Sequence, residues 1–452
     1  MDRRSFLAGA LGAAAATPAV AAVNPTADPR LRGTLDRADI GIDASSRSDG
    51  GANLQHLLDM ASSEDRQIFL PPGVFVVSEL RLPARTRLAG VPGATRLMFG
   101  GGEFMIAGER AEIVELAGLT IDGAGLPLDP SIPGILYLAE CNGVSIDNCT
   151  VTGSGASGLA FDRCAGRITR STVRTAEHAG MRIVEARGMS ITDNVVDDCG
   201  NGGILVWRWT EGEDGTIVAG NRVSNIGARD GGTGANGNGI NVFRADGVIV
   251  ANNRITDCAF TSIRANSASN IQITGNNCRG AGEVGIYSEF AFEGALIANN
   301  IVDGAATGIS VVNFNDGGRI AVISGNIVRN LTGVGPYEPE APGFGTGIAI
   351  EADAAVTGNV IDGAPLSGMA IGWGPYLRDV SVTGNVIRRA PVGVAVTVVD
   401  GAGAAVISDN LISGAEAGAV VGMRWAETAT GDLALTGARG YPHLQVERNR
   451  VS

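Results

Sequence analysis

The chain has 452 residues, of which 67 are Gly, and its formal net charge is −13. All 34 basic residues are Arg, so mechanisms that need a lysine, such as a Schiff base or a P-loop, are excluded. The acidic balance argues against general binding to nucleic acid or to an anionic membrane, because both need a basic surface.

Residues 1–22 resemble a twin-arginine export signal. Arg3 and Arg4 precede Phe6, a weakly apolar stretch follows, and the Ala-Val-Ala at 19–21 is typical of a cleavage site. A membrane anchor is the alternative, but the apolar stretch is too short to span a bilayer. The resemblance implies the twin-arginine machinery as a partner, a periplasmic or secreted location, and a mature chain without a membrane span.

Three short segments follow before the main pattern begins. Residues 51–63 are predicted to form a helix, because Leu54, Leu57 and Leu58 recur at helical spacing. Residues 68–77 resemble the strand that enters the first turn of a stacked coil, and residues 119–125 resemble another early turn of such a coil.

A short phrase recurs from about residue 140 to the end of the chain. It reads apolar, two small or polar residues, Asn, any residue, apolar, and most copies are 22 to 27 residues apart. Ten copies carry the Asn: Asn194, Asn221, Asn253, Asn276, Asn300, Asn326, Asn359, Asn385, Asn410 and Asn449. Cys149 and Ser171 take this place in two earlier copies.

A second phrase, Gly-apolar-any-apolar, usually follows each Asn after eight or nine residues. It begins at Gly158, Gly180, Gly203, Gly239, Gly285, Gly308, Gly347 and Gly368. The alternation has period two, which predicts short strands with one face inward. The Gly, Asn and Asp clusters between the strands predict turns.

Short strands at a period of about 24, without helical patterns between them, predict a stacked coil rather than a doubly wound sheet or a propeller. The pattern resembles the right-handed parallel β-helix of the pectate-lyase-like superfamily and, with the signal, the twin-arginine-exported repeat proteins, a family without an established activity. The resemblance implies an all-β domain over 23–452 with clear repeats over 140–452. It also implies that 51–63 caps the coil, that 68–77 enters the first turn, and that the Asn residues stack as a ladder.

Two further regularities concern thiols and charges. The six Cys residues are expected to be buried free thiols, with disulfides as the alternative in an exported protein. They are Cys141, Cys149, Cys164, Cys199, Cys258 and Cys278. Stacked coils are also expected to align Arg279, Asp303, Arg329, Asp362 and Arg388 as an alternating surface ladder.

Two expanded turns, 227–238 and 332–346, interrupt the repeat at the same place four coils apart. They are expected to wall a groove on the coil face, because long loops on a rigid scaffold commonly carry function. Polar, bulky residues concentrate between them and are expected to form the exposed floor of this groove. The candidate catalytic residues are Arg264, Tyr287, Glu289 and Glu351. The candidate binding residues are Trp207, Asn241, Phe243, Asn266, Trp209 and Trp373.

These features predict a protein that binds a polysaccharide in the groove, with cleavage by a lyase or hydrolase, or epimerisation, as the reactions in view. A structural or adhesive module without catalysis is the alternative, because known catalytic signatures of such folds are absent and a fold does not imply activity. His178 is interpreted as a turn residue. No metal or cofactor is expected, with calcium at 231–236 as the alternative.

Overall fold

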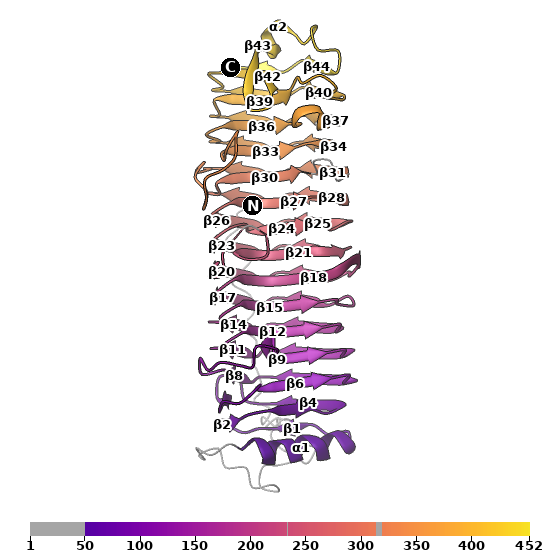
Figure 1. Ribbon diagram of the computed structural model, residues 1–452, viewed down its shortest axis with the longest axis vertical. Coiled ribbons are helices and arrows are strands. Elements are labelled where there is room, and N and C mark those ends of the chain that lie inside the picture. The colour runs from indigo at the N-terminus through magenta and orange to yellow at the C-terminus, as the bar shows by residue number, and fades with distance from the viewer. Residues whose placement is uncertain (1–49, 233, 313–318) are drawn as a thin grey trace, which may run out of the picture.

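The computed structural model describes residues 50–232, 234–312 and 319–452. In these residues the chain winds into a coil whose successive turns stack along one axis (Figure 1). Each turn adds one strand to each of three sheets, so that from β1 to β42 each strand pairs with the strand three places earlier or later in the chain. At the C-terminal end, β43 pairs with β42, β44 with β40 and β45 with β41. The predicted all-β parallel β-helix is therefore confirmed. The predicted export signal and the domain boundary at residue 23 lie outside the described residues and stay predictions.

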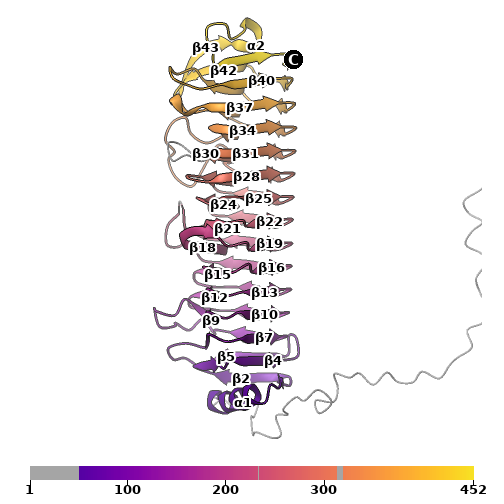
Figure 2. The same ribbon diagram turned by 90° about the vertical axis from the view of Figure 1, so that its right-hand side faces the viewer.

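Sheet A contains 15 strands, all parallel, and Figure 2 shows many of them stacked along the axis. In sheet order they are β1 (Ile68–Phe69), β4 (Arg85–Ala89), β7 (Ile113–Ala117), β10 (Gly143–Asp147), β13 (Gly166–Thr169), β16 (Ser190–Thr192), β19 (Ile217–Ala219), β22 (Ile249–Ala251), β25 (Ile271–Thr274), β28 (Glu293–Ala298), β31 (Arg319–Ser324), β34 (Ala352–Thr357), β37 (Arg378–Thr383), β40 (Ala405–Ser408) and β44 (Leu444–Glu447).

Sheet B also contains 15 parallel strands, most of them three to five residues long. They are β2 (Gly73–Val77), β5 (Thr95–Phe99), β8 (Thr120–Asp122), β11 (Thr150–Thr152), β14 (Thr172–Arg174), β17 (Val195–Cys199), β20 (Arg222–Ile226), β23 (Arg254–Cys258), β26 (Asn277–Ala281), β29 (Ile301–Asp303), β32 (Ile327–Arg329), β35 (Val360–Asp362), β38 (Val386–Arg388), β41 (Leu411–Ser413) and β45 (Arg450–Val451).

Sheet C is built from the Gly-apolar-any-apolar phrases, as predicted, and carries the candidate site. Its strands are β3 (Leu80–Leu82), β6 (Ile106–Glu109), β9 (Gly134–Ala139), β12 (Ser157–Asp162), β15 (Ala179–Val184), β18 (Gly202–Glu213), β21 (Asn238–Asp246), β24 (Ile263–Asn266), β27 (Val284–Glu289), β30 (Thr307–Val312), β33 (Thr346–Ile350), β36 (Ser367–Ile371), β39 (Val392–Thr397), β42 (Gly418–Arg424) and β43 (Glu427–Asp432). Among the strands of the described residues, β43 alone runs antiparallel, against β42, and it closes this sheet at its C-terminal end.

Both ends of the coil carry helical segments. The predicted helix is confirmed as α1 (Gly51–Ser63), and its buried Leu54, Leu57 and Leu58 face the first turn. The short helix α2 (Leu433–Thr436) lies at the other end (Figure 1), and a 3₁₀ turn, η3 (Gly374–Tyr376), connects β36 to β37. No helix in the described part of the chain is long and apolar enough to cross a membrane.

The predicted strand at 68–77 is wrong in one respect. The structure divides it into β1 and β2, with the chain turning between sheets A and B at Leu70, Pro71 and Pro72. Proline lacks the N–H that a strand interior needs, so the corner falls at these prolines.

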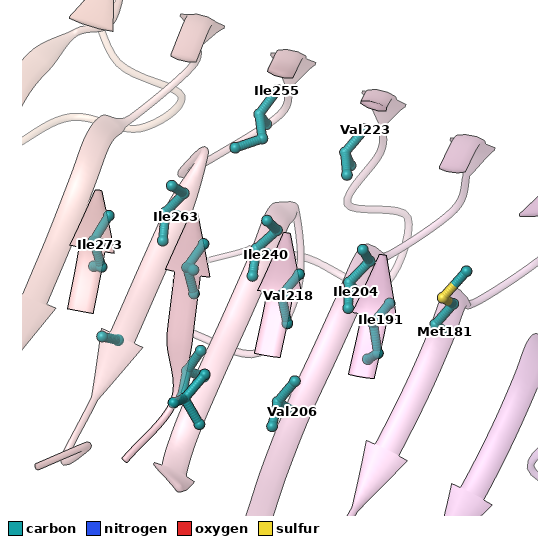
Figure 3. Close-up of a cluster of buried hydrophobic side chains, with 14 of the residues drawn as sticks. Met181, Ile191, Ile204, Val206, Val218, Val223, Ile240, Ile255, Ile263 and Ile273 are labelled. Carbon is teal, nitrogen blue, oxygen red and sulfur yellow. The ribbon is translucent and has the colours of Figure 1, made fainter. Parts of the chain in front are cut away.

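The interior of the coil is filled by the inward side chains of all three sheets. Figure 3 shows Ile204 and Ile240 from sheet C, Val218 from sheet A and Val223 from sheet B pointing into the same space. Apolar burial along the whole axis, at about 25 cal/mol per Å² of apolar surface, is the main stabilising contribution. All six Cys thiols are free and buried within this packing, which confirms the prediction.

The ten repeat asparagines form one column at the turn between sheets A and B, as predicted, and all of them except the terminal Asn449 are buried. From Asn194 to Asn410, each side-chain amide donates a hydrogen bond to the Oδ1 atom of the next Asn in the column, at 2.9–3.0 Å. The same Oδ1 also accepts the backbone N–H of the previous Asn. The column therefore fixes the register of every coil from β16 onward.

The predicted alignment of the charged residues on sheet B is confirmed, but not every ion pair forms within the ladder. Arg279, Asp303, Arg329, Asp362 and Arg388 are successive partners on sheet B. Arg329 forms an ion pair with Asp303 at 2.9 Å, whereas Asp362 pairs with the adjacent Arg389 at 2.7 Å. These pairs are largely exposed, so each contributes well under about 1 kcal/mol.

Candidate functional site

The outer face of sheet C carries the predicted site residues in two rows. The first row consists of Arg182, Leu205, Asn241, Arg264, Tyr287, Ser310, Ala349, Ala370 and Ala395. The second row consists of Val184, Trp207, Phe243, Asn266, Glu289 and Val312. Both rows agree with the predicted register except at Glu351, which was expected beside Val312 but lies just beyond the end of β33. Successive members lie about 4.8 Å apart along the axis.

Five of the six predicted binding residues line a single pocket of about 200 Å³. They are Trp207, Trp209, Asn241, Phe243 and Asn266, and we call their cavity the aromatic pocket. Gly234 and Ala235 complete its lining, so the loop 227–238 forms one wall of the pocket, as predicted. The Trp207 and Trp209 rings meet edge to face at 6.1 Å, and Trp209 is 56% exposed, which leaves its ring free to contact a ligand.

A bulge in β18 places Trp209 outside the sheet. The pairing of β18 with β21 shifts between Trp207 and Gly212, so the intervening residues leave the regular ladder. Glu185 holds the bulge, because its carboxylate accepts the backbone N–H of Trp209 and the guanidinium of Arg208, each at 2.9 Å. The exposed tryptophan is therefore fixed by the neighbouring coil.

Asn241 connects the aromatic pocket to its wall. Its side-chain amide donates to the carbonyl oxygen of Gly234 at 2.8 Å, and its Oδ1 atom accepts the indole N–H of Trp207 at 3.3 Å. The amide nitrogen and the amide oxygen of this buried side chain thus orient the loop 227–238 and the Trp207 ring, respectively.

The prediction that Arg264, Glu289 and Glu351 are exposed is wrong. They point away from the coil interior, yet they are only 7%, 2% and 5% exposed. Arg264 donates from Nε and Nη2 to the two carboxylate oxygens of Glu289, at 2.7 and 3.0 Å. Its guanidinium also lies over the ring of Tyr287. This ion pair is a buried cluster and not an open groove floor.

The loop 332–346 causes this burial. Its Tyr337 donates from the hydroxyl to Glu283 Oε1 at 2.8 Å, and Glu283 lies 3.5 Å from Arg264. The Tyr337 ring also stacks on Phe260 at 6.3 Å and meets Phe344 edge to face.

Phe260 in turn packs under the other long loop, because a Cβ added at Gly232 would lie 1.7 Å from its ring. The two loops, predicted to be separate walls, are therefore joined across the face by Phe260 and Tyr337. Sequence reasoning missed Phe260, Glu283 and Tyr337, and the aromatic residues inside the second loop were the available signal.

Burial determines the protonation of this cluster. It raises the pKa of Tyr287, and with the hydrogen bond to Glu283 it raises the pKa of Tyr337. Burial alone lowers the pKa of Arg264, but the hydrogen bond and the charge of Glu289 raise it overall. Tyr287 is therefore a protonated hydroxyl at neutral pH, able to donate but not to act as a base.

The remaining predicted residues lie in two pockets on the C-terminal side of the aromatic pocket. Tyr287, Glu351 and Trp373 line a pocket of about 400 Å³ under the loop 332–346. Trp373 also faces a neighbouring apolar pocket of about 310 Å³, where its ring meets Trp425 at 5.5 Å. The calcium alternative at 231–236 includes residue 233, which lies outside the described residues, and stays a prediction.

Comparisons with known proteins agree with this architecture. The family described as "right handed beta helix region" matches residues 133–229 and 209–387, whereas no curated protein matches the sequence. Among solved structures, the N-terminal fragment of bacteriophage phi29 gene product 12 is 15% identical, with a TM-score of 0.50 over 85% of this chain and 68% of that one. The pre-mature bacteriophage phi29 gene product 12 is 14% identical, also at a TM-score of 0.50, over 87% of this chain and 55% of that one.

The A-module of mannuronan C-5 epimerase AlgE4 from Azotobacter vinelandii is 16% identical over 91% of this chain and 99% of that one, with a TM-score of 0.44. At such identities the likeness to the phi29 proteins shows a shared fold.

Proposed function

This chain belongs to the family of right-handed β-helix proteins, and we propose that it binds a polysaccharide along the outer face of sheet C. The aromatic pocket carries this proposal. Sugar rings stack their C–H faces on aromatic rings, and Trp207, Trp209 and Phe243 offer three such rings in one cavity. The rings stand on a sheet whose register is fixed by hydrogen bonds, so they are oriented before a ligand arrives.

The row of pockets along the axis supports a polymer over a small molecule. The aromatic pocket, the pocket at Tyr287 and the pocket at Trp425 open on successive coils of the same sheet. A linear chain of sugars has the shape to contact several cavities in a line, whereas a monosaccharide fills one.

Catalysis, if the bound chain is processed, is assigned to Tyr287 and Glu351, which line the pocket under the loop 332–346. Arg264 and Glu289 are assigned a positioning role, because each neutralises the other in a buried pair. Lyase, hydrolase and epimerase chemistry all remain within this proposal. A binding module without turnover is the second candidate, and the engagement of both Glu289 oxygens by Arg264 favours it.

The experiment starts with binding of the mature chain to an array of neutral and acidic glycans. The double variant W207A/W209A is expected to lose at least tenfold in affinity for any glycan bound, since loss of a stacked ring costs over 1 kcal/mol. F69A is the matched control, because Phe69 is an exposed aromatic residue on sheet A. Equal binding by the double variant and wild type would contradict the proposal. Release of reducing ends or of unsaturated sugars from bound glycans then separates an enzyme from a binding module.

The same proposal places the protein outside the cytoplasm, in the periplasm or secreted. This location is supported by Arg3-Arg4 and the residues that follow, which resemble a twin-arginine signal. Changing both arginines to Lys should retain the full chain in the cytoplasm on cell fractionation. Continued export of that variant would contradict it.

A further inference from the structure

A second pocket, of about 330 Å³, adjoins the aromatic pocket on the same face of sheet C. We call it the histidine pocket, because His178 lines it together with Arg182, Asn201 and Asp230. Trp207 lines both pockets. Residues of the loop 227–238 line both as well, so this loop stands between two connected cavities.

The histidine pocket contains a preformed pair of polar side chains. Asn201, which is 5% exposed, accepts the backbone N–H of Asp230 at 2.9 Å and donates to its Oδ2 atom at 2.7 Å. His178 Nδ1 lies 3.5 Å from the same Oδ2. A buried amide therefore fixes an acidic side chain of the loop against the imidazole of the preceding coil.

The pair itself is open to a ligand. The side chains of His178 and Asp230 are 51% and 61% exposed, and His178 Nε2 makes no hydrogen bond within the described residues. A carboxylate and an imidazole fixed side by side offer an acceptor and a donor to the hydroxyls of one sugar. This constellation brings together residues 52 positions apart in sequence, so the isolated His178 gave no sign of it.

Charges around the two pockets favour an uncharged ligand. Arg182 is the one arginine among the described residues that line them, and its Nη1 atom is taken by Asp162 at 2.8 Å. Asp129 and Asp230 also line the histidine pocket, whereas none of the side chains that line the aromatic pocket is charged. A carboxylated or sulfated sugar would meet these two carboxylates in the histidine pocket, whereas the guanidinium of Arg244 lies over the Phe243 ring, outside the lining of the aromatic pocket.

We propose that the aromatic and histidine pockets are adjacent subsites for one neutral glycan chain. One sugar stacks on Trp207 and Phe243, and hydroxyls of a sugar further along the chain bind His178 and Asp230. This assignment rests on the proposed polysaccharide function and narrows it to uncharged sugars and to a defined segment of the face.

The test measures how affinity depends on chain length. Cello-, manno- and chito-oligosaccharides of two to eight sugars, with oligogalacturonates as the charged series, are titrated into the protein by calorimetry. For at least one neutral series the affinity of wild type should rise with length. H178A and D230A should each bind the longest members about tenfold more weakly while binding the shortest as wild type does, because each variant loses its hydrogen bond to the glycan only at the second subsite.

Matched variants keep the test independent of folding. H56A removes another exposed histidine, on α1, and should leave every affinity unchanged. W207A should weaken short and long members alike, because its ring belongs to both pockets. Circular dichroism of each variant verifies the coil.

The outcomes separate the two proposals. If neutral oligosaccharides bind but H178A and D230A retain the wild-type length dependence, the histidine subsite is wrong and the polysaccharide function stands. Tighter binding of oligogalacturonates than of every neutral series would overturn the neutral class. Absence of binding to all four series and to the glycan array would overturn both.

Discussion

The side-chain amide of Asn300 donates to Oδ1 of Asn326 at 3.0 Å, and that same oxygen accepts the backbone N–H of Asn300 at 2.9 Å. One oxygen thus ties both the side chain and the backbone of the previous coil. Asn300 repeats the arrangement toward Asn276 and donates a further bond to the carbonyl of Ile273 at 2.8 Å. Register between coils is therefore carried by a buried polar column in addition to apolar packing.

The variant N300A is expected to lower stability by about 3 kcal/mol or more, because it leaves the N–H groups of Asn276 and the carbonyl of Ile273 buried without partners. N300S should cost less, since Ser171 occupies the same column and its hydroxyl accepts the backbone N–H of Cys149. N449A is the control at the partly exposed end of the column. Urea denaturation measures the free energy of unfolding of each variant. An equal loss of stability in all three variants would contradict a cooperative column.

The fold was predictable because each coil repeats the same constraints. Apolar residues point inward at every second position of a strand, and an Asn stands at each turn from sheet A to sheet B. Together these two constraints allow only one register in which the repeats can stack. The residue rows on sheet C followed from that register, so the residues of the aromatic pocket could be placed together before any coordinates.

The burial of Arg264 was not predictable from the repeat. It depends on the loop 332–346, whose path follows no periodic pattern and is decided by Tyr337 meeting Phe260 and Glu283. The histidine pocket escaped prediction for the same reason, because Asp230 reaches His178 through the fold of the loop 227–238.

The six thiols are expected to be unreactive in the folded protein. Burial raises the pKa of Cys149 to about 11 and of Cys199 and Cys278 to about 12, and a thiolate is the reactive species. Ellman's reagent at pH 8 should therefore titrate no thiol in the native chain and six in denaturant without reductant. A hydrogen bond with the Cys164 thiol lowers the pKa of Cys141, but Cys141 is fully buried, so the reagent cannot reach it in the native chain. Fewer than six thiols in denaturant would instead reveal disulfides.

Stability is expected to fall in acid. Arginine partners hold the pKa of Glu140, Asp362 and Asp409 below their ordinary values. A lowered folded-state pKa contributes stability that is present above the unfolded value, near 4, and is lost as pH falls through the folded value.

The melting temperature should therefore decrease from pH 6 to pH 3. The variant E140Q should lose part of its stability at pH 6 and show a weaker decrease. E416Q is the control, because Glu416 is exposed and forms no ion pair within the described residues. A melting temperature that rises toward pH 3 would refute this assignment.

The aromatic pocket depends on a glycine in its wall. At Gly232 an added Cβ would overlap the ring of Phe260 at 1.7 Å, so G232A must displace either the loop or the ring and should cost about 1–3 kcal/mol. Gly431 meets nothing within 4 Å, and G431A should be neutral. Differential scanning calorimetry compares the two variants, and equal melting temperatures would show that the loop 227–238 does not rest on Phe260.

Substitutions of Arg264 and Glu289 distinguish a buried ion pair from an exposed surface, because the two cases predict different losses of stability. Removal of one partner leaves an uncompensated buried charge, so R264M and E289M should each cost about 3–5 kcal/mol. The double variant R264M/E289M removes both charges and fills the space, while Glu283 keeps its bonds from Thr261 and Tyr337. It should recover most of the loss, with a coupling energy above about 1 kcal/mol in the double-mutant cycle. Single variants that cost under about 0.5 kcal/mol would mean that the loop 332–346 does not cover the pair in solution. The prediction of an open groove floor at Arg264 and Glu289 would then be correct.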